Sequence, residues 1–462
     1  MADRMFGTNG VRGVINEDMT STLALQMGKA IGTVFKGNVA IATDTRVSAD
    51  MIKTAVSSGM MSVGTCIIDL GMLPTPAIQY YVKKHASIMG GVMITASHNP
   101  SQFNGIKCIA SDGTEASREQ EMEVEAAYAK ELPCVSWEKV GKVQKVNGAG
   151  EEYIDAVISN IDADAIRNAN FKVCLDCANG AAVQTSPLLL KKLNVRTITI
   201  NGNAQGEFPG HPSEPTEENL KDLIFMTKAT GSDLGIAHDG DADRCVFVSS
   251  DGKFVSGDKS LALLAKYILS TKKGIVITPV SSSSLVEEIV KQEGGELIYT
   301  AVGSPIVARK MIENGAVFGG EENGGLIFPE QQYCRDAAMS IVKMLECIVK
   351  NGSLSTQISK LPVYYTYNKK IYCPDNAKSH VLDFLERIST EGTVDKTDGI
   401  KIIFKDGWVL ARPSGTEPIF RIYSESKEED VAKARADEYE AKVMDFLDPD
   451  GIHRQPKTSE ER

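Results

Sequence analysis

The chain has 462 residues, which is too long for one hydrophobic core and points to three or four domains of about 100–200 residues each. Its composition, 42% hydrophobic and 24% charged, is that of a folded globular protein and excludes disordered and fibrous classes. The net charge of −11 argues against broad binding to nucleic acid or anionic membranes, and no apolar run reaches the roughly 18–20 residues that span a bilayer.

The N-terminal segment contains a loop bounded by glycines. GTNGVRG, residues 7–13, presents Arg12, whose guanidinium suits a phosphate group, although a plain turn explains the pattern equally well. The segment lacks the charged-then-apolar pattern of a secretion signal, and nine scattered cysteines suit a reducing compartment, so we expect a cytoplasmic protein. Cys174 and Cys177 are spaced C-x-x-C, but they fall in a strand-like run and would face opposite sides, which disfavours a metal or redox pair.

Three stretches, starting at residues 39, 172 and 274, share one plan of an apolar strand, a short polar loop and a helix. In the first, Ser48 is placed to cap the helix. The repeated plan predicts three similar α/β domains, each with a mixed sheet covered by helices. The apolar residues at helical spacing are Ile52, Val56, Met60 and Val63 in the first stretch and Leu285, Ile289 and Val290 in the third.

The motif TASHNP, residues 95–100, directly follows the apolar run at 91–94 and places Ser97 and His98 at a strand end. Lys107 follows ten residues after Ser97. No G-x-S-x-G elbow surrounds the serine, so a hydrolase template does not fit. A serine near cationic groups fits phosphoryl transfer better than acyl transfer, while an ordinary polar turn remains the alternative from this motif alone.

The motif HDGDADRC, residues 238–245, is the strongest local signal in the chain. Asp239, Asp241 and Asp243 alternate between two strand-like runs, and converging carboxylates favour Mg²⁺ or Ca²⁺. An EF-hand loop does not fit, because its glycine position holds Arg244 and its twelfth position holds Ser250. Three carboxylates leave coordination positions open for catalysis, and Arg244 suits an anionic ligand. A solvated acidic turn is the alternative.

Two further loops have residues suited to a sugar and a phosphate. GGEENGG, residues 319–325, offers Glu321 and Asn323 for hydrogen bonds to vicinal hydroxyls, but the motif alone is weak. RPSGTEP, residues 412–418, combines the planar fork of Arg412 with hydroxyls and a glycine that lets backbone N–H groups form an anion nest. An ordinary turn is again the alternative.

The last hundred residues predict a smaller α+β domain. Asp406-Gly407 is a hairpin signal between strands at 400–404 and 408–411, and 420–423 is a further strand. A charged amphipathic helix follows at 431–447. The polar tail from Asp448 is expected to fray. The predicted apolar face of the helix comprises Val431, Tyr439, Val443 and Phe446.

Taken together and in this order, GTNGVRG, TASHNP, DGDADR, GEENGG and RPSGTEP resemble the α-D-phosphohexomutase family over nearly the whole chain. The resemblance implies α/β architecture, with three similar mixed-sheet α/β domains and a smaller C-terminal α+β domain around a central active-site cleft. It implies boundaries at 1–150 for a phosphoserine-bearing domain, 151–253 for metal binding, 254–365 for sugar recognition and 366–462 for phosphate binding.

The same resemblance implies a role for each motif. Ser97 matches the phosphorylated serine, and Asp239, Asp241 and Asp243 match magnesium ligands that the serine phosphate completes. Glu321, with Asn323 near it, matches the sugar-reading loop. The remaining matches are Arg12, His98, Lys107 and Arg244 at further active-site positions, and Arg412, Ser414, Gly415 and Thr416 in the phosphate-binding loop.

The sugar loop departs from the commonest family pattern, G-E-x-S-G-H. Asn323 replaces the serine and Gly325 replaces the histidine, so the histidine's contribution is missing. This puts the identity of the sugar in doubt more than the type of reaction. The G-E-E-N-G-G variant is most similar to the archaeal phosphoglucosamine mutase branch, and similar sequences are also phosphomannomutase/phosphoglucomutases.

These features predict a cytoplasmic phosphohexomutase that interconverts glucosamine 6-phosphate and glucosamine 1-phosphate, with one Mg²⁺ per active site and a hexose 1,6-bisphosphate as intermediate and activator. The alternatives on the same mechanism are phosphomannomutase/phosphoglucomutase and phosphopentomutase. A metal-dependent phosphatase and a non-enzymatic phosphosugar-binding protein also remain. The expected partner is a small phosphosugar, without nucleic acid or membrane, and the expected state is a monomer or homodimer.

Overall fold

A computed structural model describes residues 5–7, 9–389, 391–414 and 418–448. The chain forms two compact units. In the part of the chain that is described, no helix is both long and apolar enough to cross a membrane. The first unit comprises Met1–Thr278, Ile289–Ile298 and Gly303–Leu361, and the second comprises Pro279–Glu288, Tyr299–Val302 and Pro362–Arg462.

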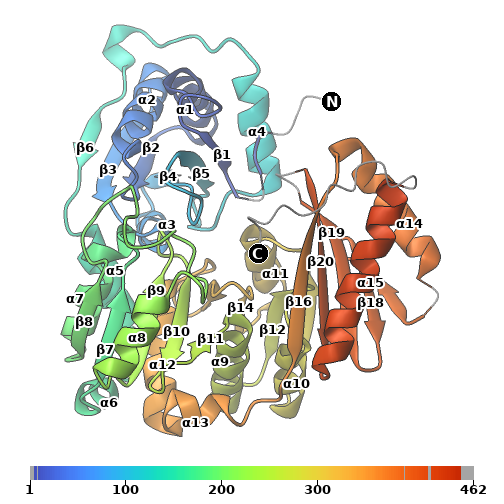
Figure 1. The fold of residues 1–462 in the computed structure, drawn as a ribbon. Helices are drawn as coiled ribbons and strands as arrows, with labels where there is room; N and C mark the ends of the chain where they lie inside the picture. The colour runs from blue at the N-terminus through green and yellow to red at the C-terminus, as the bar shows by residue number, and fades with distance from the viewer. Residues whose placement is uncertain (1–4, 8, 390, 415–417, 449–462) are drawn as a thin grey trace. The chain divides into compact units, whose positions relative to one another are not determined.

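The first sheet is mixed, with strand order β1-β5-β4-β2-β3-β6 (Figure 1). Its central strands β3, β2 and β4 run parallel, whereas β5 runs antiparallel to β4 and β1. The strands are β1 Val11–Val14, β2 Asn38–Thr43, β3 Cys66–Met72, β4 Ile88–Ile94, β5 Phe103–Ile109 and β6 Val143–Lys145, and the helices are α1 Ser21–Phe35, α2 Ala49–Ser62, α3 Thr75–Lys84 and α4 Arg118–Tyr128.

The second sheet has the order β11-β10-β9-β7-β8. Strands β8, β7 and β9 are parallel, and β9 turns into an antiparallel hairpin with β10. That hairpin holds the three aspartates at its tip. The strands are β7 Lys172–Asp176, β8 Arg196–Ile200, β9 Leu234–His238, β10 Cys245–Ser249 and β11 Phe254–Val255, and the helices are α5 Ala149–Ser159, α6 Ala163–Asn168, α7 Ser186–Lys192 and α8 Lys221–Ala229.

The third sheet has the order β13-β12-β14-β15, with β12 and β14 parallel and β14 and β15 antiparallel. The short β14–β15 hairpin contains the GEENGG loop. The strands are β12 Ile275–Pro279, β13 Glu296–Thr300, β14 Phe318–Gly320 and β15 Leu326–Ile327, and the helices are α9 Gly257–Thr271, α10 Ser284–Gln292, α11 Ser304–Asn314, α12 Ala337–Asn351 and α13 Leu354–Ile358.

The C-terminal sheet is entirely antiparallel, in the order β16-β20-β19-β18-β17. It is paired with two helices, as expected for an α+β domain. The strands are β16 Tyr365–Tyr372, β17 Thr393–Asp395, β18 Ile400–Phe404, β19 Gly407–Pro413 and β20 Ile419–Ser426, and the helices are α14 Lys378–Ile388 and α15 Glu429–Leu447. Single 3-10 turns occur at η1 Trp137–Lys139, η2 Ala181–Gln184 and η3 Asp375–Ala377.

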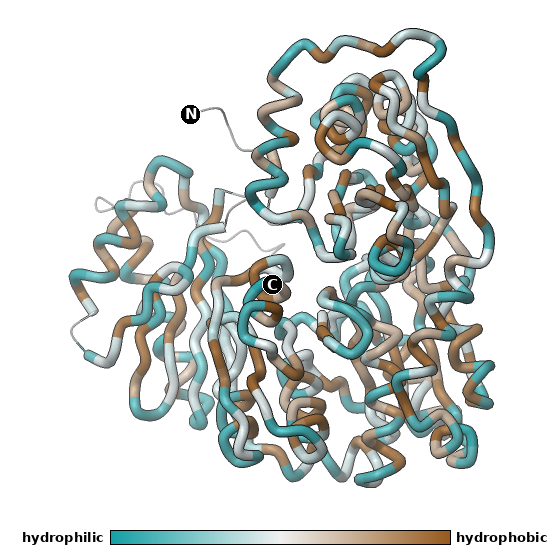
Figure 2. Tube along the Cα trace, turned by 180° about the vertical axis from the view of Figure 1, so that it is seen from behind, coloured by the Kyte–Doolittle hydropathy of each residue, from teal (hydrophilic) through white to brown (hydrophobic). Residues whose placement is uncertain are grey.

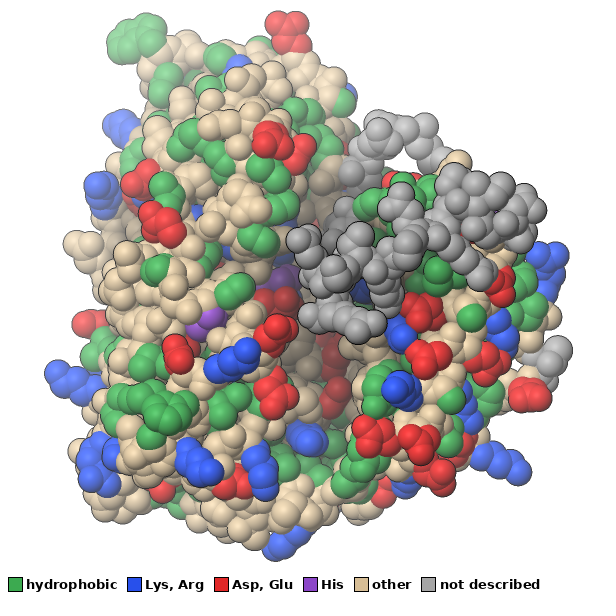
Figure 3. Space-filling view, viewed as in Figure 1, with side chains coloured by type: hydrophobic (Ala, Val, Ile, Leu, Met, Phe, Trp, Pro, Cys, Tyr) green, Lys and Arg blue, Asp and Glu red, His purple; other side chains and the backbone are tan. Residues whose placement is uncertain are grey.

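Hydrophobic residues, brown in Figure 2, are frequent along the strands and recur along the helices between hydrophilic ones. In the first sheet, β2 and β4 lie in the middle, and their apolar side chains are buried except for Met89 near the start of β4. Outside this core, acidic and basic side chains are interspersed on the face seen in Figure 3, as expected for a chain with 61 acidic and 50 basic residues.

The predicted fold class, three mixed-sheet α/β domains followed by an α+β domain, is confirmed. The central cleft and the four domain boundaries stay predictions. One local prediction was wrong: Ser48 occupies the N-cap position of α2, but its hydroxyl does not cap the helix and instead accepts a hydrogen bond from Asn104 Nδ2 at 2.9 Å. In α15, the predicted Tyr439 and Val443 are buried, whereas most of the tail lies outside the described residues.

Candidate active site

Ser97 lies in the loop that follows β4 and is fully buried. Its φ of 53° lies in the left-handed region, which is uncommon for residues other than glycine. Thr95 supports this conformation, because its hydroxyl accepts the Ser97 backbone N–H at 2.9 Å and donates to Asp44 at 2.6 Å. A strained residue held in this way is typical of a functional position.

Arg46, in the loop between β2 and α2, fixes the rest of the serine loop. Its Nη1 and Nη2 donate to the backbone carbonyls of four loop residues at 2.6–2.8 Å, and its Nε donates to Asp44 at 3.1 Å. The guanidinium is fully buried. One buried side chain therefore holds four carbonyls of this segment in place. The four carbonyls belong to Ser97, Asn99, Pro100 and Phe103.

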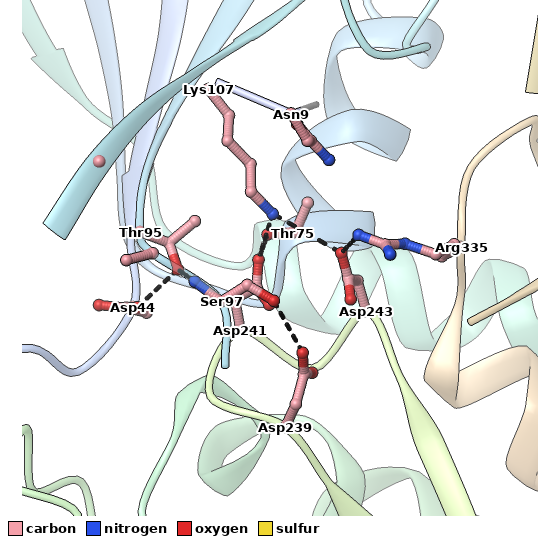
Figure 4. Close-up of polar contacts among 12 residues, drawn as sticks. Asn9, Asp44, Thr75, Thr95, Ser97, Lys107, Asp239, Asp241, Asp243 and Arg335 are labelled. Carbon is pink, nitrogen blue, oxygen red and sulfur yellow. Dashed lines mark hydrogen bonds and ion pairs between the residues drawn. The ribbon is translucent and has the colours of Figure 1, made fainter. Parts of the chain in front are cut away.

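The three aspartates of the β9–β10 hairpin lie beside Ser97 (Figure 4). Ser97 Oγ donates to Asp239 Oδ2 at 2.9 Å, and all three carboxylates are buried. One oxygen from each aspartate lies within 4.8 Å of the others. Asp241 Oδ1 and Asp243 Oδ1 accept no hydrogen bond from the described residues. Buried carboxylate oxygens left in this way fit a hard divalent cation such as Mg²⁺.

Cationic side chains partly neutralise this cluster. Lys107 Nζ lies 2.7 Å from Asp241 Oδ2 and 3.6 Å from Asp243 Oδ2, and Thr75 Oγ1 donates to the same Asp241 oxygen at 2.6 Å. Burial opposes ionisation of Asp241, but Lys107 and Thr75 together hold its pKa below the ordinary value. Burial, and then the charges of the other two aspartates, raise the pKa of Asp239.

His98, Arg12 and Arg244 also lie at this cluster. Nδ1 of His98 is 3.5 Å from Ser97 Oγ, and the charge of Arg244, followed by burial, lowers the pKa of the imidazole to about 2. His98 is therefore neutral near pH 7. Arg12 Nη1 donates to Asn99 Oδ1 at 2.8 Å on the serine loop. Arg244 Nε lies 3.8 Å from Asp239 Oδ2.

The sugar-loop candidates lie in the β14–β15 hairpin. Glu321 is 3% exposed, and its Oε2 pairs with Arg335 Nη1 at 3.0 Å. Arg335 Nη2 in turn lies 2.5 Å from Asp243 Oδ2, so the sugar loop is linked to the aspartate hairpin. Asn323 Oδ1 accepts the Gly325 N–H at 3.0 Å, which fixes the amide within its own loop.

The first unit thus brings together the predicted residues of four motifs, namely Ser97, His98, Lys107, Asp239, Asp241, Asp243, Arg244, Arg12, Glu321 and Asn323. Sequence reasoning missed Arg46, Thr75 and Arg335. Arg46 follows a buried strand in TDTR, the same kind of signal that drew attention to Ser97. Thr75 and Arg335 have no such local signal, because their importance lies in partners far away in the sequence.

The phosphate-loop candidates belong to the second unit. Arg412, on β19, pairs with Asp398 at 3.0 Å. Ser414 is buried, its N–H donates to Ile419 at 2.9 Å, and its carbonyl accepts from Lys378 Nζ at 2.6 Å. Gly415 and Thr416 lie outside the described residues.

Four family models match successive parts of the chain. They describe phosphoglucomutase/phosphomannomutase α/β/α domains I, II and III at residues 3–133, 151–252 and 256–365, and the C-terminal domain at residues 369–442.

Curated relatives and solved structures are similar over almost the same length. A phosphoglucomutase/phosphomannomutase of Thermococcus kodakarensis is 42% identical, over 93% of this chain and 96% of that protein. A phosphoglucosamine/phosphogalactosamine mutase of Sulfurisphaera tokodaii is 41% identical, over 93% and 96%. The crystal structure of a phosphoglucomutase/phosphomannomutase family protein from Burkholderia thailandensis shares the fold, with a TM-score of 0.86 and 24% identity over 97% of this chain and 99% of that one.

Proposed function

This chain belongs to the phosphoglucomutase/phosphomannomutase family of α-D-phosphohexomutases, and from that premise we propose that it moves a phosphoryl group between O6 and O1 of glucosamine through Ser97. One observation supports the role of Ser97 above all others. The serine Oγ is 2.9 Å from Asp239, at the edge of a cluster of three buried carboxylates.

In the proposed reaction, phosphorylated Ser97 gives its phosphoryl group to the free hydroxyl of a hexose monophosphate. The bond from phosphorus to Ser97 Oγ breaks, a bond to the sugar oxygen forms, and the proton that the sugar hydroxyl loses ends on Ser97 Oγ. The product is a hexose 1,6-bisphosphate. After this molecule has turned around, Ser97 Oγ takes back the other phosphoryl group, which leaves the isomeric monophosphate.

Asp239, Asp241 and Asp243 would hold one Mg²⁺, which supplies charge neutralisation for the phosphoryl oxygens when it is bound. Lys107, Arg244 and Arg12 add positive charge on the protein side. His98 is neutral and adds none. The fixed loop of Ser97 keeps its Oγ in place, so positioning also contributes to the rate.

The choice of glucosamine rests on the sugar loop. Its G-E-E-N-G-G sequence is similar to the phosphoglucosamine mutase branch, and the Sulfurisphaera relative is named for glucosamine and galactosamine. The Thermococcus relative is named for glucose and mannose, which favours those sugars as the second candidate. Glu321 would accept hydrogen bonds from ring hydroxyls in either case.

The test is a comparison of wild type, Ser97→Ala and Ser101→Ala on the 6-phosphates of glucosamine, glucose and mannose and on ribose 5-phosphate, each with its bisphosphate activator. We expect the highest kcat/KM on glucosamine 6-phosphate and loss of turnover in Ser97→Ala. Ser101 is exposed in the same loop, so Ser101→Ala should retain activity. Full activity of Ser97→Ala, or predominant release of inorganic phosphate by the wild type, would contradict the proposal.

A further inference from the structure

Arg335 is a buried arginine between two loops that the proposed function uses. It directly precedes Asp336, the N-cap of α12, and is 5% exposed. Nη1 lies 3.0 Å from Glu321 Oε2, and Nη2 lies 2.5 Å from Asp243 Oδ2. Figure 4 shows the guanidinium directed at Asp243 from the side opposite to Ser97 and Asp44. One side chain therefore contacts both a candidate metal ligand and the candidate sugar-reading carboxylate.

Gly325 makes room for this arginine. A Cβ atom at position 325 would lie 2.2 Å from Arg335 Cδ and 3.0 Å from Arg335 Cγ. A side chain at 325 and the observed position of Arg335 therefore exclude each other. Position 325 is also where this chain departs from the histidine of the common pattern, and the arginine of another element fills the space beside it.

The contact with Asp243 places Arg335 in competition with a cation. Asp243 Oδ2 is held by Arg335 and lies 3.6 Å from Lys107, while Asp243 Oδ1 accepts no hydrogen bond from the described residues. A divalent cation bound at Asp243 would repel the guanidinium, because both positive groups would interact with the same carboxylate. Arg335 therefore lowers the affinity for the cation while it holds the two carboxylates in position.

The contact between Arg335 and Glu321 favours binding of the sugar. A carboxylate that recognises a sugar must keep one orientation, and the pair with Arg335 Nη1 fixes that orientation inside a buried site. The guanidinium Nε has no hydrogen-bond partner among the described residues. Cation binding at Asp243 would weaken one of the two ion pairs and shift Arg335 towards Glu321.

We propose that Arg335 is a positioning residue that links the metal site to the sugar loop, and that Gly325 is required to admit it. The inference rests on the proposed function for the identity of the two ligands. Arg335 orients Glu321 for the sugar and moderates Mg²⁺ binding at Asp243. The two binding events are therefore energetically coupled, and the coupling is reciprocal.

The test measures Mg²⁺ binding and glucosamine 6-phosphate binding by calorimetry on dephosphorylated protein, together with kcat, KM and the urea unfolding midpoint. In Arg335→Met, we expect the Kd for Mg²⁺ to fall by about tenfold because a neighbouring positive charge is gone. We expect the Kd and KM for the sugar phosphate to rise by roughly tenfold or more, since Glu321 is no longer held.

Arg335→Lys separates charge from geometry. A lysine keeps the positive charge but lacks the planar fork that bridges two carboxylates. It should leave Mg²⁺ affinity near the wild-type value while KM for the sugar phosphate still rises. Gly325→Ala should displace Arg335, so that its effect on KM and that of Arg335→Met are not additive in the double variant.

Arg167→Met is the matched control, because the Arg167 side chain is 41% exposed on α6, where it pairs with Asp164 and donates to the carbonyl of Lys192. Weaker binding of both ligands with a lowered unfolding midpoint in Arg335→Met would reduce Arg335 to a structural role and overturn the inference. Unchanged Mg²⁺ and sugar-phosphate binding would also overturn it. Absence of wild-type turnover on every hexose phosphate would contradict the proposed function, while the Mg²⁺ isotherms would still test Arg335.

Discussion

At the scale of single residues, the two oxygens of Asp241 have different surroundings. Oδ2 accepts hydrogen bonds from Thr75 and Lys107, whereas Oδ1 has no partner among the described residues. Asp241→Asn removes the charge that would bind a cation, so we expect the Kd for Mg²⁺ to rise by about 100-fold or more. It also leaves Lys107 buried beside a neutral group, so the unfolding midpoint should fall.

Isothermal calorimetry with Mg²⁺ alone measures the first effect, and urea unfolding measures the second. The control is Asp50→Asn, since the Asp50 side chain is 93% exposed on α2. Equal Mg²⁺ affinity in Asp241→Asn and wild type would mean that the three aspartates do not form the cation site.

Arg46 supports a second prediction at this scale, because one guanidinium donates to four carbonyls of the serine loop. Arg46→Lys keeps the charge, but a lysine ammonium has three donors and cannot span the same carbonyls. We expect a loss of about 3 kcal/mol in unfolding free energy. We also expect kcat to fall by roughly 100-fold, since a displacement of Ser97 near 1 Å is enough for this.

Denaturant unfolding and single-turnover kinetics give the two numbers for Arg46→Lys. Arg196→Lys is the matched control, because Arg196 is exposed on β8 and donates to one carbonyl at 3.4 Å. A variant at position 46 with wild-type stability and kcat would show that the serine loop holds its conformation without the arginine.

At the scale of elements, the aspartate hairpin and the serine loop meet at Gly240. A Cβ atom at this position would lie 2.6 Å from the backbone oxygen of Ser97. Gly240→Ala must therefore push the β9–β10 hairpin away from the serine loop. We expect kcat to fall by roughly 100-fold, with a smaller change in KM, because the reacting groups separate while the sugar loop is untouched.

Steady-state kinetics on the preferred sugar phosphate test this expectation, with Gly150→Ala as the control. Gly150 lies on α5, and the nearest atom to a Cβ at this position would be a methyl group of Leu73 at 3.2 Å. The Leu73 side chain is flexible and can move by the small distance required. If Gly240→Ala retains wild-type kcat, the close approach of the two loops has no role in the reaction.

The sequence predicts such elements best where the pattern is local. The D-x-D-x-D alternation between two apolar runs identifies the β9–β10 hairpin, and Asp406-Gly407 identifies the β18–β19 hairpin. The roles of Arg46 and Arg335 could not be predicted from local sequence patterns. Arg335 lies 92 residues from Asp243, and a lone arginine has no periodicity that would indicate such a contact. The prediction that Ser48 caps α2 failed for the same reason, because its hydroxyl bonds to Asn104, which is distant in the sequence.

At the scale of the whole chain, the three α/β domains place their functional loops in the same way. Ser97 follows β4, Asp239 follows β9 and Glu321 follows β14, so each loop begins where a strand ends. Loops at strand ends are the usual position for ligand-binding residues in α/β sheets. A repeated topology thus places the proposed phosphoryl carrier, cation site and sugar reader on equivalent loops of three separate segments.

Global stability should depend on the buried imidazole of His238. Burial lowers its pKa to about 4, against an ordinary value of about 6.5 in the unfolded chain. Between these values the unfolded chain binds a proton that the folded chain does not, so stability is lost as the pH falls below 6.5. From pH 7 to pH 5, protonation of this group in the unfolded chain should cost about 2 kcal/mol of unfolding free energy.

Several buried carboxyl groups have raised pKa values and act in the opposite direction, as for Asp44 and Glu115, where burial is the main cause. A comparison of His238→Gln with the wild type cancels the contributions of these carboxyl groups, because both proteins contain them. Between pH 7 and pH 5, His238→Gln should lose less of its unfolding free energy in urea than the wild type does. The exposed His380→Gln should follow the wild type. Identical pH dependences for His238→Gln and wild type would mean that His238 does not resist protonation in the folded chain.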